Sequence, residues 1–229
     1  MCGRYAMYGP IVITREMQDV LDAWHLDLES EINQREDRFN IAPTMKVPVV
    51  AVHDDQTTVE AMRWGLVPSW AKDLKIGAKT INARADTVQT KPSFRTAFKK
   101  RRCLVPASGY FEWKGESPHK QPFFIKHPQD HLMLFAGLWE GWKAPDAEEW
   151  LHTFTIITGE PGKVSGDIHD RQPVILQPDA WDIWLNAEPQ DAKKILDAAP
   201  EAALSYFPVP KAVGSPKNQG AELVEPITL

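Results

Sequence analysis

The spacing of apolar residues along the chain predicts several short helices. Met17, Val20, Leu21 and Trp24 stand at i, i+3, i+4 and i+7, which places them in one apolar stripe of a helix that runs to about residue 26. Thr14 precedes this stripe and is a residue type that caps helix N-termini. Three further helices are expected: one capped by Ser93 that runs through Lys100, one that begins at Pro178 and one that begins at Pro189.

Runs of apolar and β-branched residues between turn-forming residues predict a fold rich in strands. Residues 47–52 and 59–67 flank a polar turn and predict a β-hairpin. Residues 123–126 and 132–139 predict a second hairpin in the same way. The remaining expectations are a strand at 153–158, a loop at 39–44 and, from residue 204, a strand followed by a tail.

Glu112 is a single carboxylate within the otherwise mostly apolar run 103–113. Burial beside Phe111 or Trp113 would raise its pKa and make it a candidate general acid or base near pH 7. A strand with alternating exposure would instead leave it in water. The pattern leaves both interpretations open.

Other polar and aromatic residues are candidates for ligand contacts. Asn82 and Arg84 share one face if residues 80–87 are extended, and an amide beside a guanidinium grips a phosphate or a sugar, although a solvated strand edge has the same pattern. Trp70 follows Pro68 on a connection, where an indole serves either as a base-stacking platform or as packing. His169 stands between Ile168 and an acidic residue, which suits a structural or a catalytic role.

Composition narrows the class of protein. The chain has 229 residues, 43% of them hydrophobic, and a net charge of -5, which argues against a protein that coats nucleic acid by bulk charge but not against a local basic groove. The basic run 99–102 suits a helix C-terminus as well as a phosphate track. Cys2 and Cys103 form no CxxC pair, so we expect a cytoplasmic protein with no disulfide, metal or cofactor. No run approaches a membrane span and no signal peptide is recognised.

The position of Cys2 in the chain gives it a reactivity that other cysteines lack. Removal of Met1 would leave a thiol and a free α-amine on one carbon. Such a pair captures an aldehyde in two steps, first as an imine and then as a five-membered thiazolidine ring. We expect Arg4 to push the thiol toward the thiolate. A chance cysteine at a frayed terminus is the alternative interpretation.

Six blocks in one order connect these candidates to a known family. The chain resembles the SOS response-associated peptidase (SRAP) family, and the resemblance covers residues 2 to about 226. The blocks are Met1-Cys2-Gly3-Arg4, Trp64-Gly65-Leu66-Val67-Pro68-Ser69-Trp70, Ile81-Asn82-Ala83-Arg84, Arg102-Cys103-Leu104-Val105-Pro106, Gly109-Tyr110-Phe111-Glu112-Trp113 and Ile168-His169-Asp170-Arg171.

The resemblance implies a fold and an activity. The implied fold is α+β: one SRAP-type domain over residues 1–229, with a barrel-like antiparallel β core and peripheral helices. The implied activity is covalent capture of abasic sites in single-stranded DNA by a monomer, after self-processing that removes only Met1. The implied catalytic residues are Cys2, Asn82, Glu112 and His169, and the implied DNA contacts are Arg4, Pro43, Trp70, Arg84 and Arg171.

Two positions depart from the family pattern, and two other functions compete with the implied one. Gln172 stands where the pattern has methionine, and Gly159 lies in a segment that is more often rich in threonine; both put the geometry near His169 in question. The first competing function is an N-terminal-nucleophile cysteine amidohydrolase, which would need an oxyanion hole. The second is a non-catalytic module that binds single-stranded or modified DNA, for which Cys2 would be incidental.

Overall fold

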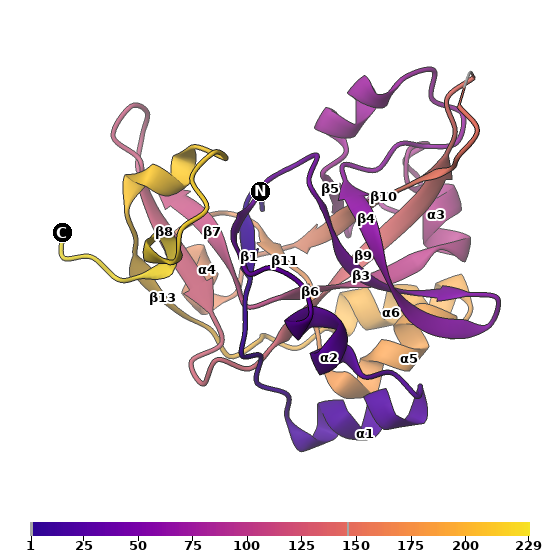
Figure 1. Cartoon of the computed structure of the whole chain (residues 1–229), viewed down its shortest axis with the longest axis horizontal. Helices are drawn as coiled ribbons and strands as arrows, with labels where there is room; N and C mark the ends of the chain where they lie inside the picture. Colours follow the sequence, from indigo (N-terminus) through magenta and orange to yellow (C-terminus); the bar gives the residue numbers. More distant parts are fainter. Residues whose placement is uncertain (1, 146) are drawn as a thin grey trace.

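A closed β-barrel forms the centre of the computed structural model, which describes residues 2–145 and 147–229 (Figure 1). Its five strands follow the order β10–β4–β3–β6–β9, and β9 pairs with β10 to close the barrel. Four of the five pairings are antiparallel, and β4 pairs with β10 in parallel. The strands are β3 (Lys46–His53), β4 (Gln56–Trp64), β6 (Arg102–Ala107), β9 (Met133–Trp142) and β10 (Leu151–Gly159).

The barrel-like core predicted from the sequence is therefore confirmed, with one difference at the β4–β10 seam. Parallel neighbours need a long crossover connection, and here the chain from β5 to β9 supplies it. Three short strands extend the larger sheet: β5 and β11 pair with β10, and β12 pairs with β9. They are β5 (Asn82–Arg84), β11 (Gln172–Pro173) and β12 (Ile175–Leu176).

A second sheet has the strand order β13–β8–β7–β1–β2 and lies beside the barrel (Figure 1). Ser108 alone separates barrel strand β6 from β7, and its hydroxyl donates to Tyr8 O at 3.1 Å and accepts from Tyr8 N. The chain thus passes directly from one sheet to the other. The strands are β1 (Tyr5–Met7), β2 (Arg38–Ile41), β7 (Gly109–Lys114), β8 (Gln121–Lys126) and β13 (Ser205–Pro208).

Helices cover the outside of the strands. Thr14 caps α1 as predicted, since its hydroxyl accepts from Met17 N, and α1 packs against α5, whose Trp181 and Trp184 are fully buried. The α-helices are α1 (Arg15–Ala23), α2 (Leu28–Asn33), α3 (Arg95–Lys100), α4 (Lys163–Gly166), α5 (Pro178–Asn186) and α6 (Pro189–Ala198), and the 3-10 helices are η1 (Leu74–Lys79), η2 (Lys211–Gly214) and η3 (Ala221–Val224).

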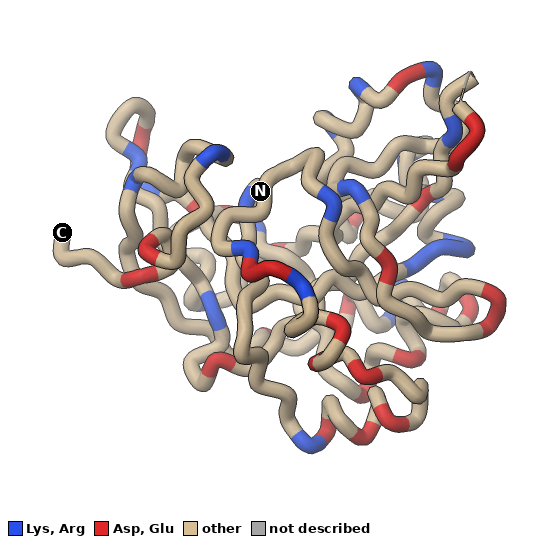
Figure 2. The backbone as a smooth tube through the Cα atoms, viewed as in Figure 1, with Lys and Arg blue, Asp and Glu red and all other residues tan. Residues whose placement is uncertain are grey.

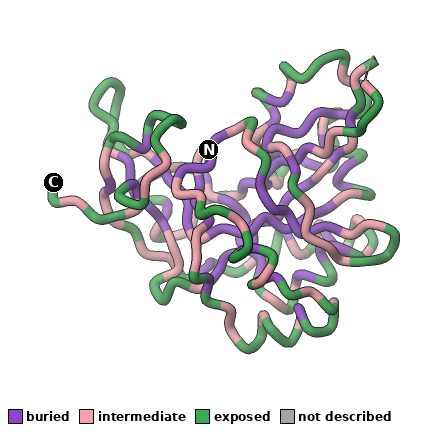
Figure 3. Tube along the Cα trace, in the orientation of Figure 1, coloured by how far each residue is buried: buried purple, intermediate pink, exposed green. Residues whose placement is uncertain are grey.

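Buried residues follow the strands, and the exposed ones gather on turns and on outer helix faces (Figure 3). Tyr5 packs edge-on against Trp64 at 5.3 Å and against Phe135 at 6.3 Å between ring centroids. These contacts join β1 of the second sheet to barrel strands β4 and β9. No helix among the described residues is long and apolar enough to cross a membrane.

The structure corrects three predicted elements. Residues 123–126 and 132–139 form strands but not a hairpin, because β8 pairs with β7 and β13 whereas β9 pairs with β6, β10 and β12. Residues 39–41 belong to strand β2 rather than to a loop, since the proline at 43 stands only after the strand has ended. Helix α3 begins at Arg95 with Phe94 at its N-cap, and no side-chain cap by Ser93 is present.

Candidate functional site

Cys2 lies where the first residues run alongside strand β7. The β1–β7 pairing aligns Tyr5 with Tyr110, and Arg4 O accepts a 3.0 Å hydrogen bond from Phe111 N. The Cys2 side chain is fully buried, and its thiol faces Arg4 O at 3.9 Å. Burial and the nearby Glu112 carboxylate raise the thiol pKa well above its ordinary value. The thiol is therefore protonated at neutral pH and needs a base to become a nucleophile.

Arg4 does not activate the thiol, contrary to the sequence-based expectation. Its guanidinium donates to Asn40 Oδ1 at 3.1 Å, to Val213 O at 2.7 Å and to Gly214 O at 3.1 Å. Asn40 is fully buried, and its amide nitrogen also donates to Val213 O. Arg4 thus anchors the segment around η2 to the N-terminal strand, with its charge directed toward backbone carbonyls.

Glu112 and His169 form a carboxyl–imidazole pair beside Cys2. Glu112 is 3% exposed on β7, and its Oε2 lies 3.9 Å from His169 Nε2. Burial raises the pKa of the Glu112 carboxyl from its ordinary 4.5 to about 7. Burial also lowers the pKa of His169. Both shifts favour the uncharged forms, so a proton can be gained or lost here near pH 7 at small cost.

The backbone that follows α4 orients the His169 ring. The backbone amide of His169 donates to Ser165 O at 2.9 Å. The backbone amide of Arg171 donates to the Nδ1 atom of His169 at 3.1 Å. Because Nδ1 accepts this bond, the neutral ring carries its proton on Nε2, on the side of Glu112. Asp170 Oδ1 lies 2.8 Å from Nδ1 and stabilises the imidazolium when the ring is protonated.

Asn82 is held by the pairing of β5 with β10, where it stands opposite Ile156. Its amide nitrogen donates to Ile81 O at 3.0 Å. Its Oδ1 is buried and has no hydrogen-bond partner among the described residues. This oxygen is an acceptor available to an amine or a hydroxyl group.

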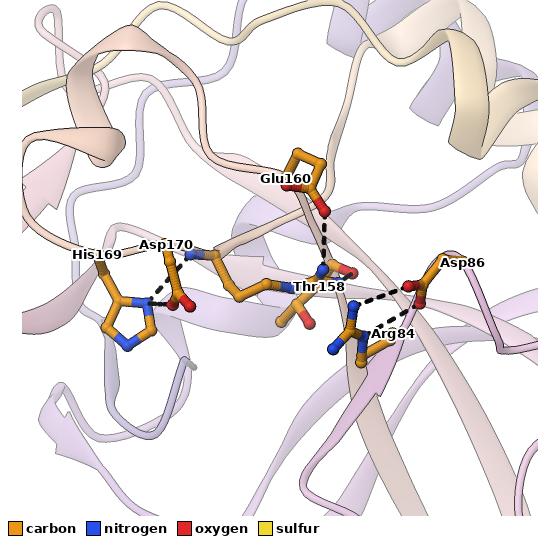
Figure 4. Close-up of polar contacts among 7 residues, drawn as sticks. Arg84, Asp86, Thr158, Glu160, His169 and Asp170 are labelled. Carbon is orange, nitrogen blue, oxygen red and sulfur yellow. Dashed lines mark hydrogen bonds and ion pairs between the residues drawn. The ribbon is translucent and has the colours of Figure 1, made fainter.

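Two predicted DNA contacts, Arg84 and Arg171, converge at the end of β10. Arg84 stands opposite Thr158 in the strand register, and Arg171 donates to Thr158 O at 2.6 Å. Each guanidinium also meets a carboxylate: Asp86 accepts from Arg84 at 2.8 and 3.2 Å, and Glu160 accepts from Arg171 at 3.1 Å (Figure 4). A cavity of about 410 Å³ with Asp86, Glu160 and Arg171 in its wall opens beside them.

Pro43 lies on the loop between β2 and β3, and Trp70 lies on the connection that follows β4. The turn after Pro43 is fixed by the bond from Thr44 N to Trp64 O at 2.9 Å. Trp70 is 60% exposed on the connection that follows β4, which is the placement predicted for it. No hydrogen bond, ion pair or ring contact among the described residues joins Pro43 or Trp70 to Glu112 or His169.

The two carboxylates that hold the arginines were missed by sequence reasoning. Asp86 follows Arg84 by two residues, and this local pair is a signal that the sequence contains. Glu160 meets Arg171 only through the path of the chain after β10, so its role needed the structure. The hydrogen bond with Arg84 lowers the pKa of Asp86, which keeps this carboxylate ionised.

The basic run 99–102 combines a helix terminus with buried contacts. Lys99 and Lys100 are exposed in the last turn of α3, where Figure 2 shows a blue segment. Arg101 pairs with Glu140 at 2.7 Å. Arg102 is buried and donates to carbonyls at the ends of α3 and α5, including Phe98 O at 2.8 Å. The second half of the run therefore serves packing rather than a phosphate track.

Gln172 and Gly159 are opposite each other in the β10–β11 pairing. Gln172 Oε1 accepts a hydrogen bond from the hydroxyl of Ser165, a residue of α4 that lies four positions before His169. A Cβ at Gly159 would come within 3.3 Å of Val174 Cγ2. Both departures from the family pattern thus have a packing role beside the loop that carries His169.

The fold and the site together define a class of protein. Its members have a β-barrel, a cysteine at the second position of the chain and a buried carboxyl–imidazole pair beside that cysteine. Within this class the chain belongs to the family described as SOS response associated peptidase (SRAP), whose sequence profile matches residues 1–216. The predicted family membership is confirmed.

Individual relatives agree with this assignment. The abasic site processing protein YoqW of Bacillus subtilis (strain 168) is 37% identical over 229 residues, which cover 98% of this chain and 99% of the relative. The abasic site processing protein YedK of Escherichia coli (strain K12) is 32% identical, with 99% and 100% covered. A crystal structure of a protein from Bacteroides thetaiotaomicron matches with a TM-score of 0.78 and 25% identity, and covers 99% of this chain and 100% of its own.

Proposed function

We propose that this protein captures abasic sites in single-stranded DNA by forming a thiazolidine crosslink through Cys2, and that it acts as a monomer. The family and the names of its relatives supply the reaction class. The observation that carries the proposal is Glu112, a buried carboxyl with a pKa raised to about 7, which lies 3.9 Å from His169 and near enough to the Cys2 thiol to raise its pKa.

The first step is hydrolysis of the peptide bond after Met1, a residue that lies outside the described ones. One water is consumed, methionine leaves, and the α-amine of Cys2 becomes free. Peptidase activity is limited to this self-processing. Asn82 Oδ1, which is buried and has no hydrogen-bond partner among the residues that the structure describes, is an acceptor suited to hold the new amine.

The second step joins protein and DNA. An abasic sugar reacts through its ring-opened aldehyde, and opening the ring moves the C1 hydroxyl proton to the ring oxygen. The imidazolium form of His169, which Asp170 stabilises, would give its Nε2 proton to the ring oxygen, and the neutral ring that results would take up the C1 hydroxyl proton. The Cys2 amine adds to the aldehyde carbon, and one water leaves to give an imine. Glu112 donates a proton to the departing hydroxyl as the acid and takes the thiol proton as the base. Sulfur then adds to the imine carbon and closes the ring, so the adduct equals protein plus DNA minus one water.

The DNA path uses the arginines at the end of β10 and the exposed indole. Arg84 and Arg171 would exchange Asp86 and Glu160 for phosphates, while Trp70 stacks on a base and Pro43 shapes the loop beside it. An abasic nucleotide has no base to unstack, so a bent single strand presents it at low cost.

The test is crosslinking to an oligonucleotide with one abasic site, measured on a denaturing gel with untagged protein. Wild type should form a band that survives denaturation, and Cys2→Ala should form none. Cys103→Ala is the matched control, because Cys103 is a second buried thiol that belongs to barrel strand β6, and it should crosslink as wild type does. Equal adduct with Cys2→Ala would contradict the mechanism, and retained binding without any adduct in wild type would favour a DNA-binding module.

A further inference from the structure

Three side chains converge inside one end of the barrel, and the reaction proposed above uses none of them. They are His53, Glu60 and His152. Glu60 Oε2 lies 2.9 Å from His53 Nε2, and Glu60 Oε1 makes a short contact with His152 Nδ1. One ligand atom from each side chain lies within 4.8 Å of the other two, and among the residues that the structure describes this is the one such group of three.

Strand topology brings the three residues together from distant parts of the sequence. His53 ends β3, Glu60 lies in the first half of β4, and His152 is the second residue of β10. Because β4 runs antiparallel to β3 and parallel to β10, the end of β3 and the starts of β4 and β10 meet at the same end of the barrel. Thr158, where Arg171 binds, is six residues further along β10, roughly 20 Å away at about 3.3 Å per residue.

The cluster is partly buried but reachable from solvent. The side chains of His53, Glu60 and His152 are 28%, 34% and 28% exposed. Trp139 packs against both imidazoles, with ring centroids 4.5 Å from His53 and 5.0 Å from His152. Arg101, whose guanidinium carbon lies 6.0 Å from the centroid of this indole, is paired with Glu140, so its charge is neutralised.

The donor set suits a metal ion better than a simple hydrogen-bonded cluster. His53 Nε2 is buried and, despite its 2.9 Å approach to Glu60, is not aligned to hydrogen bond to any described residue. Two imidazole nitrogens and a carboxylate oxygen are ligands that zinc and its late first-row neighbours prefer. Each neutral ring can move its proton to the other nitrogen and so present a lone pair to the ion.

We propose that His53, Glu60 and His152 form a binding site for one divalent transition-metal ion, with Zn²⁺ as its representative. Three protein ligands leave the fourth position of a tetrahedral ion to water or to an exogenous ligand. The ion would bridge the β3–β4 hairpin and β10, which pairs with β4 in the barrel. The site is separate from the Cys2 site, and its role is to stabilise the barrel.

The experiment is Zn²⁺ titration of the full chain after chelator treatment, by calorimetry and by thermal unfolding. We expect one Zn²⁺ per chain and a Tm that rises by several degrees at free Zn²⁺ about 100 times Kd, with reversal by EDTA. Glu60→Gln, which keeps the side-chain shape, and His152→Ala should each weaken binding by at least about 10-fold. Mg²⁺, which prefers oxygen ligands, should give no shift.

Two controls separate this site from others. His119→Ala removes an exposed histidine from another part of the chain and should bind Zn²⁺ as wild type does. Cys2→Ala should keep Zn²⁺ binding and lose crosslinking, whereas Glu60→Gln should lose Zn²⁺ binding and keep crosslinking. Absence of Zn²⁺ binding, wild-type affinity in Glu60→Gln, or loss of binding in Cys2→Ala would each overturn the proposal.

Discussion

At the scale of single residues, Glu112 illustrates how a reactive group costs stability. The unfolded chain ionises this carboxyl near its ordinary pKa of 4.5, whereas the folded protein does so only near 7. Between these values the folded state holds a proton that the unfolded state has lost, so stability falls as pH rises through this window. A shift from 4.5 to about 7 corresponds to about 3 kcal/mol of unfolding free energy.

Glu112→Gln should therefore exchange activity for stability. The difference in free energy of unfolding, variant minus wild type, should grow by on the order of 3 kcal/mol as pH rises from 4.5 to 7. Above pH 7 this difference should stay nearly constant. Urea unfolding at pH 4.5 and pH 8 measures this difference, and crosslinking by the variant should be lost or greatly slowed. A stability difference that is the same at both pH values would show that folding does not raise the pKa of the Glu112 carboxyl.

Asn40 shows a different kind of buried polar residue, one that is fully paired. Its side chain accepts from Arg4 and donates to Val213 O at 3.1 Å, Ser215 O at 3.0 Å and Asn218 O at 2.9 Å. This amide holds the 213–218 segment against β2 and against Arg4, two residues after Cys2.

Asn40→Ala should lower the free energy of unfolding by about 2–4 kcal/mol, because it leaves buried carbonyls and the Arg4 guanidinium with fewer partners. Asn186→Ala is the matched control: Asn186 is exposed on α5, bonds only to Asp182 among the described residues, and should change stability by less than about 0.5 kcal/mol. Denaturant midpoints of the two variants give the comparison, and equal values would contradict the anchoring role.

At the scale of elements, the end of β10 combines two arginines, Arg84 and Arg171, with carboxylates that pair with them. Both pairs are accessible on the carboxylate side, since Asp86 is 51% and Glu160 is 84% exposed. In the proposed DNA path each pair would have to open before a phosphate binds, so the carboxylates would compete with DNA. Exposed ion pairs are worth up to about 1 kcal/mol, which bounds the size of this competition.

Asp86→Asn and Glu160→Gln should thus each raise affinity for an unmodified single strand, by up to about 5-fold. Fluorescence anisotropy at several salt concentrations measures the effect, and the gain should shrink as salt rises. Asp22→Asn, on α1 away from β5 (Figure 1), makes the same charge change and should leave affinity nearly unaltered. An equal gain in affinity with Asp22→Asn would show that net charge, and not release of the arginines, causes the effect.

Elements were predicted from sequence where local pattern decides them. The stripe from Met17 to Trp24 and the cap at Thr14 define α1, and the prolines at 178 and 189 stand at the first positions of α5 and α6. Strand pairing was predicted correctly only for the tight β3–β4 hairpin, because alternation of apolar residues says which residues form a strand but not which strand lies beside it. The false β8–β9 hairpin follows from this limit.

The candidate site shows the same division. Motif blocks indicated Cys2, Asn82, Glu112 and His169, and the structure places Glu112 and His169 side by side. The burial of Glu112 and the diversion of Arg4 toward η2 depend on contacts across more than a hundred residues, which no local pattern contains. The His53–Glu60–His152 cluster likewise needs the closed barrel.

At the scale of the whole molecule, the Cys2 site and the His53–Glu60–His152 cluster lie at different parts of the barrel. The second sheet and the loop after α4 bring Cys2, Glu112 and His169 to one side, while the β3–β4 turn and the start of β10 lie at the other. Acidic residues predominate along α1 and α2 and at the β3–β4 turn, away from the end of β10 (Figure 2).

The most direct test of the central claim is the intact mass of the untagged protein after it is mixed with a single-stranded oligonucleotide that carries one abasic site. The account predicts a species equal to the protein without Met1, plus the oligonucleotide, minus one water, and no adduct with an unmodified strand. A version with an N-terminal extension that retains Met1 should form no such species. A stable adduct on the extended protein, or no adduct on a protein whose Cys2 is free at the terminus, would contradict the account.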